Sequence, residues 1–442
     1  MNRKLMFYIT LVFPGLGQAI NKQYKKAFVG LLFFIMSWIS VISLIIPTLS
    51  SLVYYNTAGE YEGKYTIGRT PWVPGAESFD DSFLIIVLSV FSILLLLVLV
   101  FVAYMFARDA RSVRDSINND EEVVTLKEKL RAVAPDLIPH AITTPAYVLM
   151  FLFMIVPAIV SIVIVFTNYK TPVLPPAFLI EWAGMENYVD LFTDPSLASV
   201  FKETFVWTMV WTFCATTLTI VLGTFLAVVL HNKRIKGKKF FRMVYLLPWA
   251  VPAFLTILIF QIFFSKVGAM NTIILPFFTG TEYTSVGAVG FLLDPQLAKM
   301  TIILIQAWLG FPFVFVLVTG ILQAIPDDLY EASGIDGGNA WTNFWDITFP
   351  LIMIAAAPML ITQYTFNFNN VTIIYLLGGA VVKPLGSTYG PLETIASLGY
   401  QLTLDAQYAT AAAFTLISSI IVSVIVLISW MKTGAFKNEE LM

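Results

Sequence analysis

Charged side chains are scarce in this sequence. Of its 442 residues, 12% are Asp, Glu, Lys or Arg and 58% are hydrophobic, and the mean hydropathy is +0.81. Length alone would suggest two or three soluble domains, but this composition indicates an integral membrane protein instead. The net charge of −2 offers no basic excess for binding nucleic acid.

Cysteine, histidine and nucleotide-binding signatures are also scarce or missing. Cys214 is the single cysteine, which excludes an intrachain disulfide. With two histidines besides, a metal site with the usual ligands is not expected, and no cofactor is predicted. No G-x-x-x-x-G-K-[ST] pattern occurs, so we do not expect this chain to hydrolyse ATP or to be an enzyme.

Long apolar runs, in contrast, are abundant. A helix needs about 20 apolar residues to cross the hydrocarbon core of a bilayer. Eight runs meet that length, at 28–50, 83–107, 144–166, 203–230, 244–264, 299–321, 350–377 and 409–431. The predicted fold class is therefore an all-α polytopic membrane protein with about eight transmembrane helices.

The basic residues predict how these runs are oriented. Five Lys and Arg precede the first run, six lie in 108–143, six in 231–243 and two after the last, whereas the other loops hold few. Because cytoplasmic loops carry the excess of Lys and Arg, both termini and the loop 322–348 are expected in the cytoplasm. The predicted location is the cell membrane, with multiple passes.

These patterns divide the chain into five predicted segments. They are an interfacial or re-entrant segment at 1–27, two helices at 28–107, a cytoplasmic linker at 108–143, a helical core at 144–431 and a cytoplasmic tail at 432–442. A signal peptide is the alternative for the first segment, since it begins with basic residues and a short apolar run. However, no small-residue cleavage site follows that run.

Two helical faces within the membrane carry amide side chains. Each face has the spacing i, i+3, i+4, i+7: Gln306, Leu309, Gly310 and Phe313 in the sixth run, and Gln363, Phe366, Asn367 and Asn370 in the seventh. At about 1.5 Å per residue, both faces reach the outer half of a core about 30 Å thick. Amides at that depth predict a substrate pathway, although hydrogen bonding between helices is the alternative.

The chemistry of these faces is neutral. No Asp or Glu lies in the interior of the eight runs. Amides can bond to hydroxyl groups, and Phe313 and Phe366 offer flat apolar faces to a sugar ring. Ion-coupled carriers normally need carboxylates or histidine within the membrane, so this pattern disfavours them.

A short polar loop separates the sixth and seventh runs. Pro326 suits the first position of a helix, and Asp336-Gly337-Gly338 is expected to end it, because glycine tolerates the left-handed conformation. The loop has the order Glu331-Ala332-Ser333, three residues, Gly337, nine residues, Ile347, one residue, Phe349-Pro350. This spacing resembles the EAA motif of binding-protein-dependent ABC importer permeases, with Ser333 and Phe349 replacing Ala and Leu. An ordinary helix-turn-helix connector is the alternative.

Two further stretches narrow the resemblance. Ala307–Phe313 and Phe366–Asn370 are similar to the larger, MalF-type permease subunit of maltose/maltodextrin ABC importers. The resemblance implies a type I importer permease fold with a six-helix core and a translocation pathway for maltose or maltodextrin. It also implies the partners: a second, MalG-type permease, an ATPase dimer that hydrolyses ATP, an extracellular sugar-binding protein and membrane lipid.

The same resemblance assigns roles to individual residues. It implies sugar contacts for Leu309, Gly310, Phe366, Asn367 and Asn370, and ATPase coupling for Glu331, Ala332, Ser333 and Gly337. Gln306, Phe313 and Gln363 complete the predicted substrate-binding set, but the best-known relatives have Asn, Tyr and Ser there. The alternatives are therefore a permease for another oligosaccharide and, outside this family, an ion-coupled sugar carrier that works alone.

Overall fold

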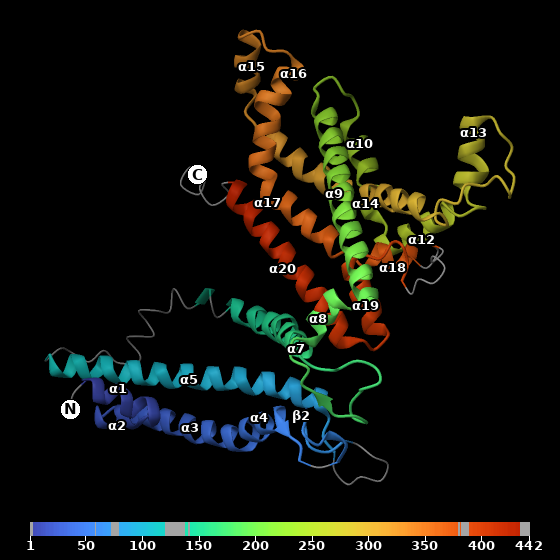
Figure 1. Cartoon of the computed structure of the whole chain (residues 1–442). Coiled ribbons are helices and arrows are strands. Elements are labelled where there is room, and N and C mark those ends of the chain that lie inside the picture. The colour runs from blue at the N-terminus through green and yellow to red at the C-terminus, as the bar shows by residue number, and fades with distance from the viewer. Residues whose placement is uncertain are drawn as a thin grey trace. The chain divides into compact units, whose positions relative to one another are not determined.

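Most of the chain is described by a computed structural model, shown in Figure 1. It describes residues 3–57, 59–71, 79–119, 138–139, 142–378, 381 and 389–433. Most of the predicted linker, 120–137 and 140–141, and residues 434–442 of the predicted tail lie outside this part. Within it, seven helical stretches are long and apolar enough to cross a membrane: Tyr24–Leu52, Ser82–Asn118, Ile142–Ile164, Pro195–His231, Pro295–Ala324, Ala340–Gly378 and Tyr408–Met431.

The fifth predicted run, 244–264, is not one continuous helix. It forms the end of α10 (Lys238–Tyr245), then α11 (Leu247–Ala250) and α12 (Ala253–Phe263). The chain is extended between the last two, with ψ of 135° at Val251 and 131° at Pro252. Proline has no N–H to donate and disfavours a helical conformation in the residue before it. The apolar run therefore breaks near its middle.

The chain forms two compact units, and the first comprises Met1–Tyr188 with Gln407–Ala412. In it, α1 (Arg3–Val12) and α2 (Leu16–Ile20) form a hairpin that packs against α3 (Tyr24–Ser40) and α5 (Ser82–Asn118). The turn between α1 and α2 lies close against α3: a Cβ on Gly30 of α3 would lie 2.5 Å from the Cα of Gly15 in the turn. Helix α3 continues through η1 (Val41–Ile45) into α4 (Ile46–Leu52), and η3 (Phe151–Ile155) leads into α7 (Val156–Ile164).

A small antiparallel sheet joins two loops of this first unit. Its strands β1 (Tyr54–Tyr55), β2 (Tyr65–Ile67) and β3 (Ile180–Glu181) pair in that order, with the short helix η2 (Gly59–Tyr61) between the first two. An ion pair of 2.8 Å between Lys64 Nζ and Glu181 Oε1 reinforces the sheet. Hydrogen bonding to that carboxylate raises the pKa of Lys64. Helix α8 (Glu186–Thr193) follows at the boundary of the unit.

The second unit is built on α9 (Pro195–His231), α14 (Pro295–Ala324) and α17 (Phe349–Phe368), which pack against one another. Both α9 and α14 begin with an Asp–Pro pair. Asp194 accepts hydrogen bonds from the N–H groups of residues 196 and 197. Asp294 accepts hydrogen bonds from the N–H groups of residues 296 and 297. These caps satisfy amides at each helix start that the helix itself leaves free.

Glycines allow α9 and α14 to approach closely. A Cβ on Gly223 would lie 2.6 Å from the Cβ of Val314, and one on Gly310 would lie 2.8 Å from Cγ2 of Thr219. The interface is therefore of the small-residue type that suits helix packing in a membrane. The remaining elements are η4 (Met270–Ile274), α13 (Leu275–Thr279), α18 (Thr372–Gly378), α19 (Ile395–Leu404) and α20 (Tyr408–Thr433).

Candidate functional site

A cavity of about 500 Å³ lies in the second unit, among α11, α12, α14, α17 and α18. Its volume is within the range of roughly 300–1,000 Å³ that is usual for small-molecule sites. The lining residues are Pro248, Trp249, Val251, Pro252, Ala253, Ile257, Gln306, Leu309, Gly310, Phe313, Gln363, Phe366, Asn370, Thr372 and Ile373. None of these side chains is charged.

Seven of the eight residues predicted to bind substrate line this cavity. The four predicted on the sixth run all belong to α14, one helical face of which forms a wall. The amides of the two predicted faces meet, because Asn370 Nδ2 donates to Gln306 Oε1 at 3.3 Å. The structure thus places these residues together; their contact with a substrate remains a prediction.

Asn367 is the predicted residue that does not line the cavity. Its side chain is 1% exposed, and its Nδ2 donates to Thr216 Oγ1 on α9 at 2.9 Å. The indole N–H of Trp211, also on α9, donates to the backbone carbonyl of Asn367 at 2.9 Å. Helix α17 ends at Phe368, so Asn370 lies beyond it, and the two amides do not share a helical face.

The broken run 244–264 supplies a part of the cavity that was not among the predicted site residues. Trp249 is exposed on this wall, and its ring lies 6.3 Å from that of Phe313, centroid to centroid, at 42°. Together with the exposed Phe366, these rings give the cavity aromatic faces. The signal was the pair of prolines at 248 and 252, which indicates a break where backbone and side chains face a cavity.

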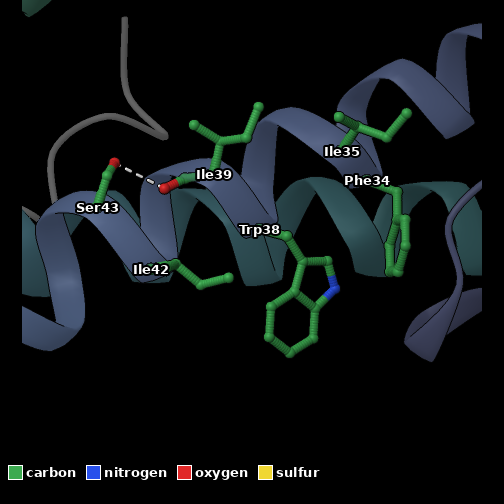
Figure 2. Close-up of a pocket in the computed structure, with 6 residues that line it drawn as sticks. All are labelled: Phe34, Ile35, Trp38, Ile39, Ile42 and Ser43. Carbon is green, nitrogen blue, oxygen red and sulfur yellow. Dashed lines mark hydrogen bonds between the residues drawn. The ribbon is translucent and has the colours of Figure 1, made fainter.

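A second hollow, of about 410 Å³, lies along α3 and η1 in the first unit (Figure 2). It is lined by Phe34, Ile35, Trp38, Ile39, Ile42 and Ser43. The hydroxyl of Ser43 donates to the carbonyl oxygen of Ile39 in its own helix at 2.7 Å. Because the Ser43 hydroxyl is already bonded, the lining offers a ligand mainly apolar side chains. This surface suits hydrocarbon better than a ligand rich in hydroxyl groups.

The predicted loop motif forms a helical hairpin at one end of the second unit (Figure 1). Its first helix, α15 (Asp327–Ile335), ends as expected: Gly337 has a φ of 84°, and the N–H of Gly338 donates to the carbonyl oxygen of Ser333 at 2.8 Å. Pro326 precedes the helix as its N-cap and is not its first residue. The chain continues through α16 (Ala340–Thr342) and η5 (Asn343–Thr348) into α17.

Side-chain bonds hold the two arms of this hairpin together. Ser333 Oγ donates to Asn343 Oδ1 at 2.6 Å, and the hydroxyls of Tyr330 and Thr348 lie 2.9 Å apart. Ser333 is half-buried, whereas Glu331, Ala332 and Gly337 are exposed, and the contact of these four residues with an ATPase stays a prediction. Exposed apolar side chains accompany them at Leu329, Ile335 and Trp341.

An ion pair links the hairpin to the loop after α9. Lys233 Nζ lies 2.9 Å from Asp327 Oδ2, and this hydrogen bond raises the pKa of Lys233. Both groups are exposed, so the pair contributes little to stability. It does place the basic run after α9 beside the first turn of α15.

Membrane-spanning helices around an uncharged cavity, with an exposed helical hairpin at one end, define a polytopic transport component. The family model described as "Binding-protein-dependent transport system inner membrane component" matches residues 219–432. The chain is 39% identical to the maltodextrin transport system permease protein of Streptococcus pneumoniae over 434 residues, 97% of this chain and 96% of that one. The chain belongs to this family and is a membrane permease subunit, as the motifs predicted.

Two further comparisons extend this result. The galactooligosaccharides transport system permease protein of Bacillus subtilis is 36% identical over 441 residues, 99% of this chain and 100% of that one. A crystal structure of a bacterial alginate ABC transporter, with an alginate pentasaccharide-bound periplasmic protein, contains a chain with a TM-score of 0.55 and 19% identity. The match covers 68% of this chain and 95% of that one. It confirms the polytopic helical fold of an ABC transporter permease.

Proposed function

We propose that this chain forms part of the translocation pathway of an ATP-driven importer for maltodextrins. The observation that supports this best is the cavity itself. Amides from α14 and from the segment after α17 meet there, next to Trp249, Phe313 and Phe366, and no lining side chain is charged. A neutral ligand would exchange hydrogen bonds with water for bonds to amides, and its rings would lie against the aromatic faces.

The partners follow from the family and from the hairpin. A membrane component of a binding-protein-dependent system works with a binding protein, here an extracellular one for sugar. The exposed face of α15 and the exposed Trp341 would dock on an ATPase subunit in the cytoplasm, with Glu331, Ala332 and Gly337 at or near the contact and Ser333 supporting it. A second homologous permease would complete the pathway, and both termini would be cytoplasmic.

A galactooligosaccharide is the second candidate substrate, because a relative named for its transport matches the whole chain at similar identity. Both ligands are neutral and rich in hydroxyls, so the chemistry of the cavity accommodates either. They differ in the orientation of hydroxyls and linkages. The amides of Gln306, Gln363 and Asn370 would then have to discriminate between them.

Uptake of labelled sugar tests the proposal and separates these two substrates. A strain that lacks this subunit but retains its partners would be complemented with the wild-type chain. We expect restored uptake of labelled maltotriose, with little competition from a tenfold excess of galactotriose. Uptake of galactotriose alone would favour the second candidate, and uptake of neither sugar would contradict both.

A further inference from the structure

Positive charge gathers at one end of the first compact unit. Residues 3–26 and 104–119 contain eight lysines and arginines and two aspartates, in a chain whose net charge is −2. The basic residues are Arg3, Lys4, Lys22, Lys25, Lys26, Arg108, Arg111 and Arg114. Topology alone would account for the number of these charges. It does not account for how some of them are arranged around a cavity.

This cavity, of about 480 Å³, lies along α5 where α1 packs against it. It is lined by Phe7, Tyr104, Arg108, Arg111, Ser112, Asp115 and Ser116. Arg108 and Arg111 are exposed, and neither has an ion pair or hydrogen bond from its side chain to any residue that the structure describes. Two guanidinium groups thus face one hollow without a partner in the described protein.

The same face of α5 is apolar on the side of the cavity nearer the middle of the helix. Leu97, Val100, Phe101 and Tyr104 follow one another at i, i+3, i+4 and i+7, and all four are exposed. The stripe then continues one turn on with Arg108 and Arg111. At about 1.5 Å per residue, roughly 10 Å of apolar surface leads directly into the basic hollow.

Phe7 and Tyr104 lie at the level where the apolar stripe on α5 ends and the basic residues begin. Their rings lie 5.9 Å apart in an edge-on arrangement, on α1 and α5 respectively. Tyrosine side chains such as that of Tyr104 collect where the hydrocarbon of a membrane meets its headgroups. The apolar stripe therefore has the place of an acyl chain, and the arginines have the place of a headgroup.

We propose that this face of the first unit binds an anionic phospholipid. Its phosphate lies against Arg108 and Arg111, because guanidinium groups bind phosphate oxygens with paired hydrogen bonds. The hydroxyls of Ser112 and Ser116 donate to the same group, while Asp115 accepts a hydrogen bond from a headgroup hydroxyl, such as that of a glycerol. One acyl chain lies along Leu97 and Phe101.

Binding of two lipids with identical acyl chains tests the site. The purified full-length chain would be titrated with phosphatidylglycerol and, separately, with phosphatidylcholine, and bound lipid would be counted by native mass spectrometry. We expect a preference for phosphatidylglycerol that falls about thirtyfold in Arg108→Gln/Arg111→Gln, since each basic residue near a membrane surface contributes roughly a factor of five. The control is Lys64→Gln/Arg69→Gln, which removes two charges at the other end of the unit and should keep the preference.

Three outcomes would overturn the proposal. They are no preference in the wild-type chain, an unchanged preference in the arginine variant, or an equal loss in the control, which would mean that total charge decides. Inorganic phosphate separates a lipid site from a free-anion site: bound phosphatidylglycerol should resist millimolar phosphate. Phe101→Gln should also weaken phosphatidylglycerol binding, because the acyl chain would lose its apolar contact. Thermal unfolding of each variant shows that it is folded.

Discussion

At the scale of single residues, three neighbouring asparagines at the C-terminal end of α17 and just beyond it have different surroundings. Asn367 is buried against α9, Asn369 is exposed and donates to the carbonyl of Thr365, and Asn370 faces the cavity. We predict that Asn370→Ala lowers sugar affinity by about ten- to a hundredfold, since an unpaired ligand hydroxyl costs about 1–3 kcal/mol. Asn369→Ala is the matched control and should transport normally. Uptake per assembled complex is measured for both variants. Equal uptake by Asn370→Ala and Asn369→Ala would remove Asn370 from the site.

Asn367→Ala should behave differently from either. This change removes the bond to Thr216 and leaves a small void in a buried position, so we expect about 1–3 kcal/mol less stability and less assembled complex. Uptake per complex should stay close to that of the wild type. The opposite result, normal assembly with weak sugar binding, would show that Asn367 contacts the sugar itself, as the family resemblance implies.

The candidate site could be predicted from sequence as far as helical periodicity holds. The four positions on α14 share a face because that helix is continuous. The prediction that Asn370 shares a helical face with Asn367 assumed that the next helix continues past Phe368, where the structure ends it. A helix end without a proline or glycine leaves no clear signal in the sequence, since tertiary bonds such as that from Trp211 decide it.

At the scale of elements, the left-handed Gly337 determines where α15 stops. Nothing lies within 4 Å of a Cβ built there, so a substitution would cost backbone strain of about 1–2 kcal/mol without a clash. We predict that Gly337→Ala lowers transport and sugar-stimulated ATPase activity, because α15 would no longer present the same face. Gly280→Ala is the control, with a similar φ of 67° and equally open space after α13. If both variants transport equally well, the hairpin geometry does not couple the two activities.

The interface of α9 and α14 gives a second prediction at this scale. Gly223→Ala would place a methyl group 2.6 Å from the Cβ of Val314, and the two helices would have to separate. Overpacking of this kind costs about 1–3 kcal/mol, so the melting temperature of the purified chain should fall. Gly320→Ala, on α14 with nothing within 4 Å, should leave it unchanged or slightly higher. Equal melting temperatures for the two variants would contradict the close packing.

At the scale of the whole molecule, hydrophobic run length predicted most of the membrane helices. It failed at 244–264, because run length does not register a backbone break, although the prolines there indicated a kink. That break supplies Trp249 and Pro252 to the cavity. The division into two compact units could not be predicted from the sequence either, since it depends on which helices pack together.

The energy source is also a property of the whole chain. A proton- or sodium-coupled carrier needs a group at membrane depth whose charge changes during the cycle. The lining of the cavity is uncharged, and the apolar runs contain no carboxylate in their interiors. We therefore predict that uptake needs ATP and continues when a protonophore collapses the proton gradient. Cells or vesicles with ATP held constant provide the measurement, and a known proton-coupled sugar carrier in the same membranes serves as the control. If the protonophore stops uptake by both proteins, the proton gradient drives transport by this chain. The exposed face of α15 would then have a role other than contact with an ATPase.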